Sequence, residues 1–253
     1  MTPTQIDIPR IEVPRWTAQE FERQVLENDP KVAVFDCDGT LWSGDAGYGF
    51  MVWSLEQGLV SRSTSDWIDT RHRAYRNGLV SEVAICGEMV QIYAGLREQE
   101  LREAAAQYFS QHVEHRIFPE MVALITKLRE RGSQLWAVSS TNRWVVAEGA
   151  RRFEIPEDRV LAADVRVENG VITSDLIDVP TDEGKAETLR RIGLPRPDAV
   201  FGNSIHDLAM LEVARNAYPV NPSPALIQAA AKRSWRYFLP ESADAIEAAV
   251  TGE

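Results

Sequence analysis

The stretch that most constrains the fold is residues 31–42, KVAVFDCDGTLW. An apolar run of strand character ends there in two aspartates, Asp36 and Asp38, which are followed by a Gly-Thr turn. Alternate residues of a strand face the same way, so both carboxylates project to one side and Cys37 to the other. In an open α/β sheet, ligands bind at the carboxyl end of the strands. A carboxylate pair needs a positive neighbour such as a divalent metal; an ordinary strand end with an Asp-Gly turn is the alternative.

Strand and helix patterns alternate along much of the chain. A possible N-cap at Thr17 begins a short amphipathic helix. Strand patterns follow at residues 31–35, 134–138, 160–163, 199–201 and 217–220. Helical patterns separate these strands, which is typical of a parallel sheet covered on both faces. We therefore expect an α/β fold with a Rossmann-like, doubly wound parallel sheet.

One long segment interrupts this alternation. From Tyr48 to His115 the apolar residues recur at helical spacing. We expect a helical cap domain, residues 44–116, inserted after the first strand of a core that is formed by 1–43 and 117–253. Later in the core, the pattern predicts a hairpin over 165–177 with Asn-Gly at its turn, a last strand at 235–239 and a closing helix at 242–250.

Charge and composition exclude several classes of partner. The net charge of -11 argues against a nucleic-acid or anionic-membrane surface. No run approaches the roughly 18 apolar residues that a membrane helix needs, and the polar residues 1–16 do not resemble a signal peptide. Cys37 and Cys86 show neither metal-ligand spacing nor a disulfide framework. We expect a cytoplasmic protein that binds neither nucleic acid nor membranes.

Polar side chains follow three of the expected strands. The first strand ends at Asp36 and Asp38, and the others run into Ser139-Ser140-Thr141 and into a loop that contains Asn203 and Asp207. In a doubly wound sheet these ends gather in one crevice. Lys185, one of few lysines in an arginine-rich chain, lies early in an expected helix and could reach the same place. Taken alone, it would be a solvated helix residue.

The order of these features resembles the haloacid dehalogenase superfamily of aspartate-nucleophile hydrolases. Its four motifs match DxDGT at 36–40, a hydroxyl at Ser139, a lysine at Lys185 and GNSxxD at 202–207. The helical insert directly after the first motif looks most like the phosphoserine-phosphatase-type branch with a helical cap. The second aspartate, and the absence of lysine from 44–116, favour phosphoryl transfer to water over the superfamily's other reactions.

The resemblance implies a role for each matched residue. Asp36 would attack phosphorus and form an aspartyl phosphate, while Asp38 would act as general acid and then general base. Thr40 would anchor the turn by hydrogen bonding. Ser139, with Ser140 beside it, would bind the phosphoryl oxygens, unless Ser139–Asn142 is a plain helix cap. Lys185 would neutralise the charge shared by phosphate and nucleophile.

Mg²⁺ is the metal that the resemblance implies. Asp36, the backbone carbonyl of Asp38, Asn203 and Asp207 would hold it, and oxygen ligands suit this ion. The family most often has Gly-Asp where this chain has Gly202-Asn203. A neutral amide should bind the ion more weakly. Two interpretations stay open: a Mg²⁺-dependent phosphatase, or a catalytically weakened member that binds a phosphorylated ligand or a partner protein.

The substrate is expected to be a small phosphorylated metabolite. Asp45 falls where phosphoserine phosphatases carry a carboxylate for the substrate amine, but residues 80–96 lack the arginine that such enzymes use. Arginines at 62, 71, 73 and 76 form a basic run that is a candidate to contact an acidic leaving group, and a solvated helix face is the alternative. Six aromatic residues could cage an ammonium group or simply form the core of the cap: Trp42, Tyr48, Phe50, Trp53, Trp67 and Tyr75. A homodimer is possible on size alone.

Overall fold

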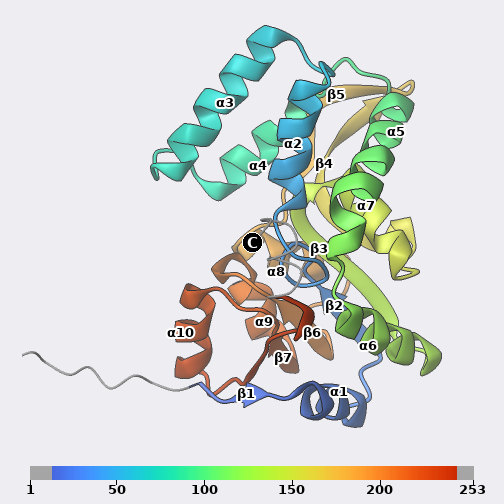
Figure 1. Ribbon diagram of the computed structural model, residues 1–253, viewed down its shortest axis with the longest axis vertical. Helices are drawn as coiled ribbons and strands as arrows, with labels where there is room; N and C mark the ends of the chain where they lie inside the picture. The colour runs from blue at the N-terminus through green and yellow to red at the C-terminus, as the bar shows by residue number, and fades with distance from the viewer. Residues whose placement is uncertain (1–12, 244–253) are drawn as a thin grey trace, which may run out of the picture.

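A six-stranded sheet organises the computed structural model, which describes residues 13–243 (Figure 1). The strand order is β5-β4-β3-β2-β6-β7. The strands are β2 (Val32–Phe35), β3 (Gln134–Asn142), β4 (Val160–Glu168), β5 (Val171–Asp178), β6 (Ala199–Gly202) and β7 (Asn216–Pro219). Neighbouring strands run parallel, except that β4 and β5 form an antiparallel hairpin at one edge. The predicted α/β fold with a Rossmann-like, mostly parallel sheet is confirmed.

The two faces of the sheet bury separate sets of side chains. Ala33 and Phe35 of β2 belong to one core cluster and Val34 to the other, as the alternation along a strand requires. On the first face, Phe35, Phe201 and Tyr218 stack across three neighbouring strands, with ring centroids 4.4 and 5.0 Å apart. Burial on both faces explains why these short strands read as continuous apolar runs.

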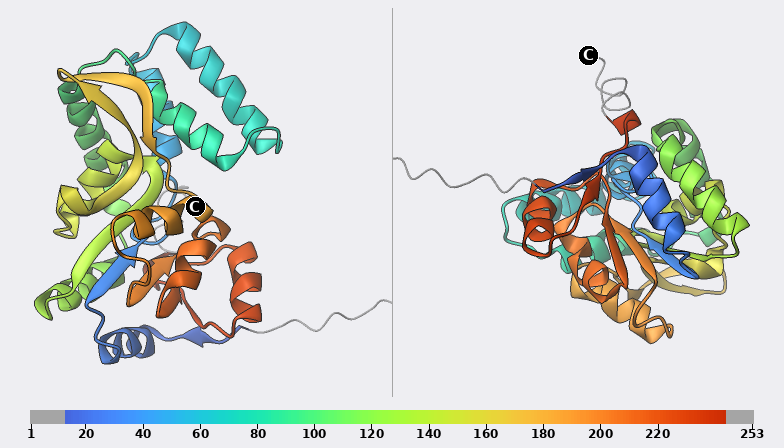
Figure 2. Two further views of the ribbon diagram at one scale, coloured as in Figure 1. Left: turned by 180° about the vertical axis from the view of Figure 1, so that it is seen from behind. Right: turned by 90° about the horizontal axis from the view of Figure 1, so that it is seen from below.

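Helices cover both faces, as Figure 2 shows from two further directions. Helices α1, α6 and α7 contribute to the cluster of Phe35, whereas α8, α9 and α10 contribute to that of Val34. Their bounds are α1 (Ala18–Glu27), α6 (Pro119–Glu130), α7 (Arg143–Arg152), α8 (Glu183–Arg191), α9 (Leu208–Val213) and α10 (Pro224–Lys232). Thr17 caps α1 through a capping box with Glu20, which confirms its predicted role. Two short parallel strands, β1 (Arg15–Trp16) and β8 (Tyr237–Phe238), pair beside α1.

Four helices lie between β2 and α6 in the chain, and we call them the inserted helices. They are α2 (Ala46–Glu56), α3 (Arg62–Arg76), α4 (Glu82–Gln91) and α5 (Glu98–Tyr108). The chain then continues through one π-helical turn and one 3₁₀ turn at 109–116. The predicted helical character of this segment is confirmed, and within residues 13–243 every helix falls short of the length and apolar character needed to cross a bilayer.

The hairpin of β4 and β5 reaches the inserted helices (Figure 1). Its backbone pairs with the segment between α4 and α5. The loop between α4 and α5 runs along β5: the Gly95 N–H donates to Ile172 O, the Ile172 N–H to Leu96 O and the Glu98 N–H to Gly170 O, at 2.8–2.9 Å. The inserted helices are therefore tied to the sheet by backbone hydrogen bonds as well as by the chain connections. The predicted hairpin turn is confirmed, with Asn169 and Gly170 both at positive φ.

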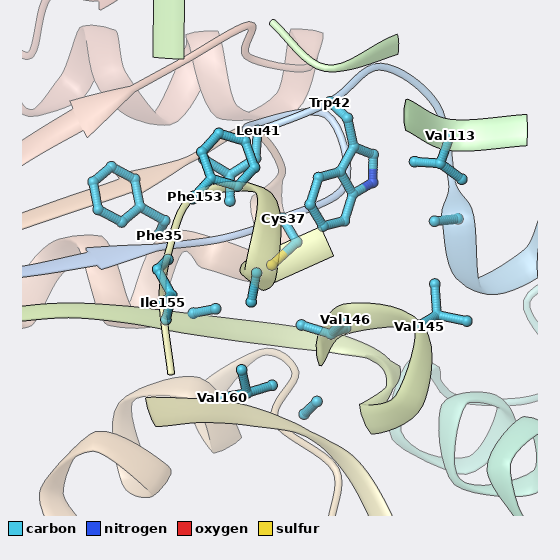
Figure 3. Packing of buried hydrophobic residues seen from close by; sticks show 14 of the residues in the cluster. Phe35, Cys37, Leu41, Trp42, Val113, Val145, Val146, Phe153, Ile155 and Val160 are labelled. Carbon is cyan, nitrogen blue, oxygen red and sulfur yellow. The ribbon is translucent and has the colours of Figure 1, made fainter. Parts of the chain in front are cut away.

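Trp42 belongs to the hydrophobic core and extends it to the turn that follows β2 (Figure 3). Its ring is fully buried and packs near Phe153, with ring centroids 6.5 Å apart. Gly149 makes room for it, because a Cβ there would lie 2.5 Å from the indole. Cys37 lies in the same cluster and is buried, so it points away from the carboxylates and packs as a small hydrophobic residue.

Some predicted boundaries were wrong. Strand β3 does not end at Val138 but continues to Asn142, because 139–142 keep an extended backbone until α7 begins. The segments predicted as a short strand at 160–163 and a hairpin arm at 165–167 form one strand, β4, with register shifts near Val165. The last strand is shorter than predicted, and most of the helix predicted for 242–250 lies outside the described residues.

Candidate active site

Lys185 joins two carboxylates from distant parts of the chain. Its ammonium donates to Asp36 Oδ1 at 2.7 Å and to Asp207 Oδ1 at 2.5 Å, and all three side chains are buried. Asp36 follows β2, Lys185 lies in the first turn of α8, and Asp207 closes a 3₁₀ turn just before α9. Removing one partner from such a buried cluster leaves an uncompensated charge, so the three residues fix the three elements relative to one another.

Asp207 also holds the loop that follows β6. Its Oδ2 accepts hydrogen bonds from the backbone N–H groups of Asn203 and Ser204 at 2.8 and 2.9 Å. A Cβ at Gly202 would lie 2.7 Å from the Asp207 side chain, so glycine is needed there. Because both oxygens of Asp207 bind protein donors behind the cavity wall, the geometry favours a positioning role. Its predicted contact with a metal stays a prediction.

Asp38 accepts hydrogen bonds from three groups. Its Oδ1 accepts from the Trp42 indole N–H at 2.6 Å and from the Ala46 N–H at 2.8 Å, and its Oδ2 accepts from the Thr141 hydroxyl at 2.6 Å. These donors lie in the turn after β2, at the start of α2 and near the end of β3. They fix the orientation of a carboxyl group that reaches the cavity next to Asp36.

In the turn after Asp38, the backbone of Gly39 lies very close to the side chain of Asn203. Thr40 lies where the sequence predicts an anchoring hydrogen bond, since its hydroxyl donates to Asp36 Oδ2 at 2.8 Å. Gly39 has a φ of 77°, and a Cβ there would lie 1.8 Å from Asn203 Nδ2. Glycine is required on both counts. The Asn203 side chain therefore lies directly against the turn that carries the two aspartates.

The helix-cap alternative for 139–142 applies to one residue of the four. Asn142 is the N-cap of α7, and its side chain accepts from the Val145 N–H at 3.1 Å. Ser139 is buried and lines the cavity, and its Oγ accepts from the Thr141 N–H at 3.1 Å. A hydroxyl that accepts one bond still has a proton to donate. Ser139 can therefore donate to a ligand oxygen, and Ser140 lines the same cavity.

The electrostatics of the site suit a bound cation. Burial and the Asp207 carboxylate raise the pKa of Asp36 to about 7, although Lys185 opposes that shift. Burial likewise raises the pKa of Asp38, against the effect of its hydrogen bonds. Burial alone would lower the pKa of Lys185, but Asp207 and Asp36 outweigh it and raise the pKa. Carboxylates whose charged forms are disfavoured in this way are stabilised by a nearby cation.

The oxygen atoms at these strand ends fit Mg²⁺ only if carboxylate, amide and backbone carbonyl oxygens act together as ligands. Asp36, Asp38 and Asn203 line one end of the cavity. Across residues 13–243, no three His, Cys, Asp or Glu side chains gather as a metal-binding group. A magnesium ion would therefore depend on the Asn203 amide and on a backbone carbonyl, besides carboxylate and water. Such oxygen ligands are ones that Mg²⁺ accepts.

A cavity of about 290 Å³ lies between the strand ends and the inserted helices. Ser139, Lys185 and Asn203 line its strand-end side together with the two aspartates. The opposite side is lined from α2, α3, α4 and the turn before α2 by Asp45, Tyr48, His72, Tyr75, Glu82, Ile85, Cys86, Met89 and Val90. Asp45, predicted to bind substrate, is also the N-cap of α2 and accepts from the Tyr48 N–H at 2.8 Å. Asp45 keeps an exposed surface, but loss of hydration from the protein atoms around it, followed by the charge of Asp38, raises its pKa to about 6.

The six aromatic residues considered for a ring cage or a core lie in three different environments. Tyr48 and Tyr75 line the cavity, whereas Trp42 and Phe50 are fully buried in the core. Trp53 packs against that core, and Trp67 is exposed. Two arginines of α3 bind carboxylates outside the cavity: Arg71 forms two hydrogen bonds with Glu88, and Arg73 pairs with Asp69. The guanidinium of a third, Arg76, lies over the ring of Tyr48, 5.8 Å from its centroid.

Sequence reasoning missed several residues at this site. Thr141 was grouped with the serines but given no role, although the strand period already places it on the same side as Ser139. Glu82 was not identified, because one sequence does not reveal which side of α4 faces the cavity. His206 also lines the cavity, and its Nδ1 lies 2.7 Å from Asp182 Oδ1.

Comparisons with known proteins identify a family. The sequence model of the haloacid dehalogenase-like hydrolases matches residues 33–212. A probable phosphatase of Mycobacterium tuberculosis is 30% identical over 124 residues. That match covers 47% of this chain and 42% of the relative, so the chain matches less than half the length of this curated protein.

Solved structures share the fold at low sequence identity. A Bordetella pertussis protein of unknown function superimposes with a TM-score of 0.71 at 22% identity, covering 82% of this chain and 97% of that one. A substrate-bound phosphoserine phosphatase gives a TM-score of 0.56 at 16% identity, covering 87% and 97% of the two chains. At these identities the likeness concerns the fold alone.

Proposed function

The chain belongs to the haloacid dehalogenase-like hydrolases, and from this membership we propose that it is a Mg²⁺-dependent phosphatase of a small phosphomonoester. The family and the curated relative support phosphatase activity in general. One observation carries the finer proposal: a buried lysine holds Asp36 at the cavity, beside a second carboxyl group on Asp38 that has its own donors. In this proposal, residues 44–116 act as the cap domain over a core of 1–43 and 117–253.

Asp36 is the nucleophile of the first step. Its carboxylate attacks phosphorus, the bond to the leaving oxygen breaks, and Asp38 gives that oxygen a proton. Ser139 and Lys185 bind the phosphoryl oxygens as charge develops. Asp36, the Asp38 carbonyl and Asn203, with Asp207 behind them, would hold Mg²⁺, which would supply further positive charge to the site.

Water completes the reaction. Asp38, now a carboxylate, takes a proton from the attacking water, the bond between phosphorus and the Asp36 oxygen breaks, and inorganic phosphate leaves. Hydrogen bonds from Trp42 and Thr141 hold Asp38 in one orientation through both steps. The same group therefore serves as acid and then as base without moving away from the phosphoryl group.

A matched pair of variants tests the proposal. Purified protein with MgCl₂ should release p-nitrophenol from p-nitrophenyl phosphate, and Asp36→Asn should lower kcat by about 10³-fold or more, because an amide is no nucleophile here. Asp29→Asn makes the same chemical change at an exposed residue that pairs with Lys31, and it should leave kcat unchanged. Equal turnover by the Asp36 and Asp29 variants would refute the mechanism.

Asn203 favours one second candidate: a weakened member of the family that binds a phosphorylated ligand with little turnover. An amide contributes no negative charge to a magnesium site. If Asn203 is a ligand, Asn203→Asp should lower the Mg²⁺ concentration for half-maximal activity by about tenfold. No turnover of a phosphometabolite panel by either form, at any Mg²⁺ concentration, would favour the binding protein over the enzyme.

A further inference from the structure

The wall of the cavity opposite the strand ends would face the leaving group. Asp36, Ser139 and Lys185 occupy the other end, where the phosphoryl group is expected to bind. The alcohol that leaves must then lie against α2, α3 and α4. The side chains of those helices that line the cavity therefore determine which alcohol fits, and their charge is the first property to establish.

This wall carries negatively charged side chains but no lysine or arginine of its own among the described residues. Asp45 and Glu82 both line it, and among the described residues Lys185 is the only lysine or arginine that lines the cavity. Lys185 is already paired with two carboxylates at the far end. Burial, followed by the charge of Arg76, lowers the pKa of His72, which disfavours the charged form of its ring.

Glu82 shows most directly that a partner is missing. Its Oε2 is enclosed by protein and accepts no hydrogen bond from any residue in the described part of the chain. Its Oε1 has a weak donor, Cys86 Sγ, at 3.6 Å. The nearest cationic candidate is His206, whose Nε2 lies 3.9 Å from Glu82 Oε2, too far for a hydrogen bond, while its Nδ1 is held by Asp182. An enclosed carboxylate oxygen without a donor is costly, so a donor from a ligand would be favourable.

Aromatic faces lie beside these carboxylates. Tyr48 and Tyr75 line the same wall. His72 stacks on the Tyr48 ring with centroids 4.2 Å apart and Arg76 lies over that ring, so Tyr75 is the ring offered to a ligand here. Burial, followed by the interaction of the phenol with the Glu82 carboxylate as a hydrogen-bonding neighbour, raises the pKa of Tyr75. This neutral phenol therefore lies next to Glu82 and brings it no positive charge. Ring faces attract cations, and an ammonium group offers both the positive charge and the N–H donors that Glu82 lacks.

We propose that the cavity takes a phosphomonoester whose leaving alcohol carries a positive charge, with Glu82 facing that charge. The inference rests on the proposed phosphatase function. An amino alcohol phosphate satisfies Glu82, whereas a leaving group with a carboxylate of its own meets two like charges and no arginine among the cavity-lining residues. The preferred substrate is therefore cationic at its far end, and not anionic or zwitterionic.

Three substrates of equal length isolate this charge. 2-Aminoethyl phosphate, n-propyl phosphate and phosphoglycolate end in an ammonium, a methyl and a carboxylate group. With the wild-type protein, kcat/KM should be about tenfold or more higher for the first than for the second, and lowest for the third. Turnover of p-nitrophenyl phosphate serves as the reference, because its absence would refute the proposed function itself. Its presence, with equal kcat/KM for the three probes, would overturn only the charge preference.

A matched pair of variants assigns the preference to Glu82. Glu82→Gln should reduce the ratio of kcat/KM for 2-aminoethyl over n-propyl phosphate by about tenfold. Glu88→Gln makes the same change on the same helix, at a carboxylate that pairs with Arg71 outside the cavity, and it should leave the ratio unchanged. A ratio does not depend on the fraction of folded protein. Equal effects of the two variants would remove Glu82 from the site; if Glu82→Gln is inactive, the wild-type comparison still decides.

Discussion

At the strand ends, each carboxylate accepts hydrogen bonds from other elements of the fold, whereas on the inserted helices Glu82 keeps an enclosed oxygen with no donor among the described residues. Lys185, Thr40 and Thr141 hold the first set in place before any ligand arrives. The first end is preorganised by the protein, so its groups need little rearrangement during a reaction. The second end leaves part of its hydrogen bonding to what binds there.

The largest effect is expected from a substitution that disrupts the preorganised groups at the strand ends. Lys185→Met leaves Asp36 and Asp207 buried together without their shared cation, so both activity and stability should fall. We expect kcat/KM to drop by about 10³-fold and the free energy of unfolding by about 3–5 kcal/mol. Chemical denaturation and p-nitrophenyl phosphate assays measure the two losses. Lys127→Met, which breaks an exposed pair with Glu22, is the control; similar losses in both variants would contradict the coupling described at the strand ends.

A smaller effect should follow from loosening Asp38 alone. Thr141→Val keeps the shape of the side chain but removes the hydroxyl that donates to Asp38 Oδ2. We expect kcat to fall about 10–100-fold with KM within about threefold, because orientation of the acid-base group matters in the chemical steps and less in binding. Thr126→Val removes a hydroxyl on the exposed side of α6 and should change neither constant. A rise in KM at constant kcat would instead place Thr141 in substrate binding.

The smallest effect concerns how pH changes stability in the metal-free protein. The pKa values of Asp36 and Asp45, about 7 and about 6, lie above those of unfolded carboxyl groups near 4. The folded state therefore binds these protons more tightly, and stability rises as pH falls from about 7.5 to about 5.5. We expect Tm in excess EDTA to be about 2–5 °C higher at the lower pH.

Two further measurements separate the contributions of Asp36 and Asp45 to this change in Tm. Asp45→Asn should remove the part that comes from the inserted helices. Saturating MgCl₂ should remove most of the part from Asp36, because a bound cation favours the ionised carboxylate. A Tm that rises with pH over this range in EDTA would contradict the raised pKa values.

Sequence alone predicted the strand-end groups well, because a parallel sheet fixes where the strands end. Once Asp36, Ser139 and Asn203 were placed after strands, topology brought them together. The helical wall was harder to predict. Which side of α3 or α4 faces a cavity depends on how the helices pack. Packing places Tyr75 at the cavity and Trp53 against the core, and the sequence pattern did not distinguish the two. Boundaries failed where polar residues such as Ser139 and Thr141 continued a strand, because propensity favours turns for them.

The pairing of residues 95–98 with β5 has a consequence for self-association. The hairpin forms the outer edge of the sheet, and an open edge strand offers unpaired N–H and C=O groups to another copy of the chain. Here the main chain between α4 and α5 already occupies that edge around Ile172. The sheet is thus protected along this part of its rim from adding a foreign strand. If two copies form the homodimer that size makes possible, side chains and not continued strand pairing should join them at this part of the edge.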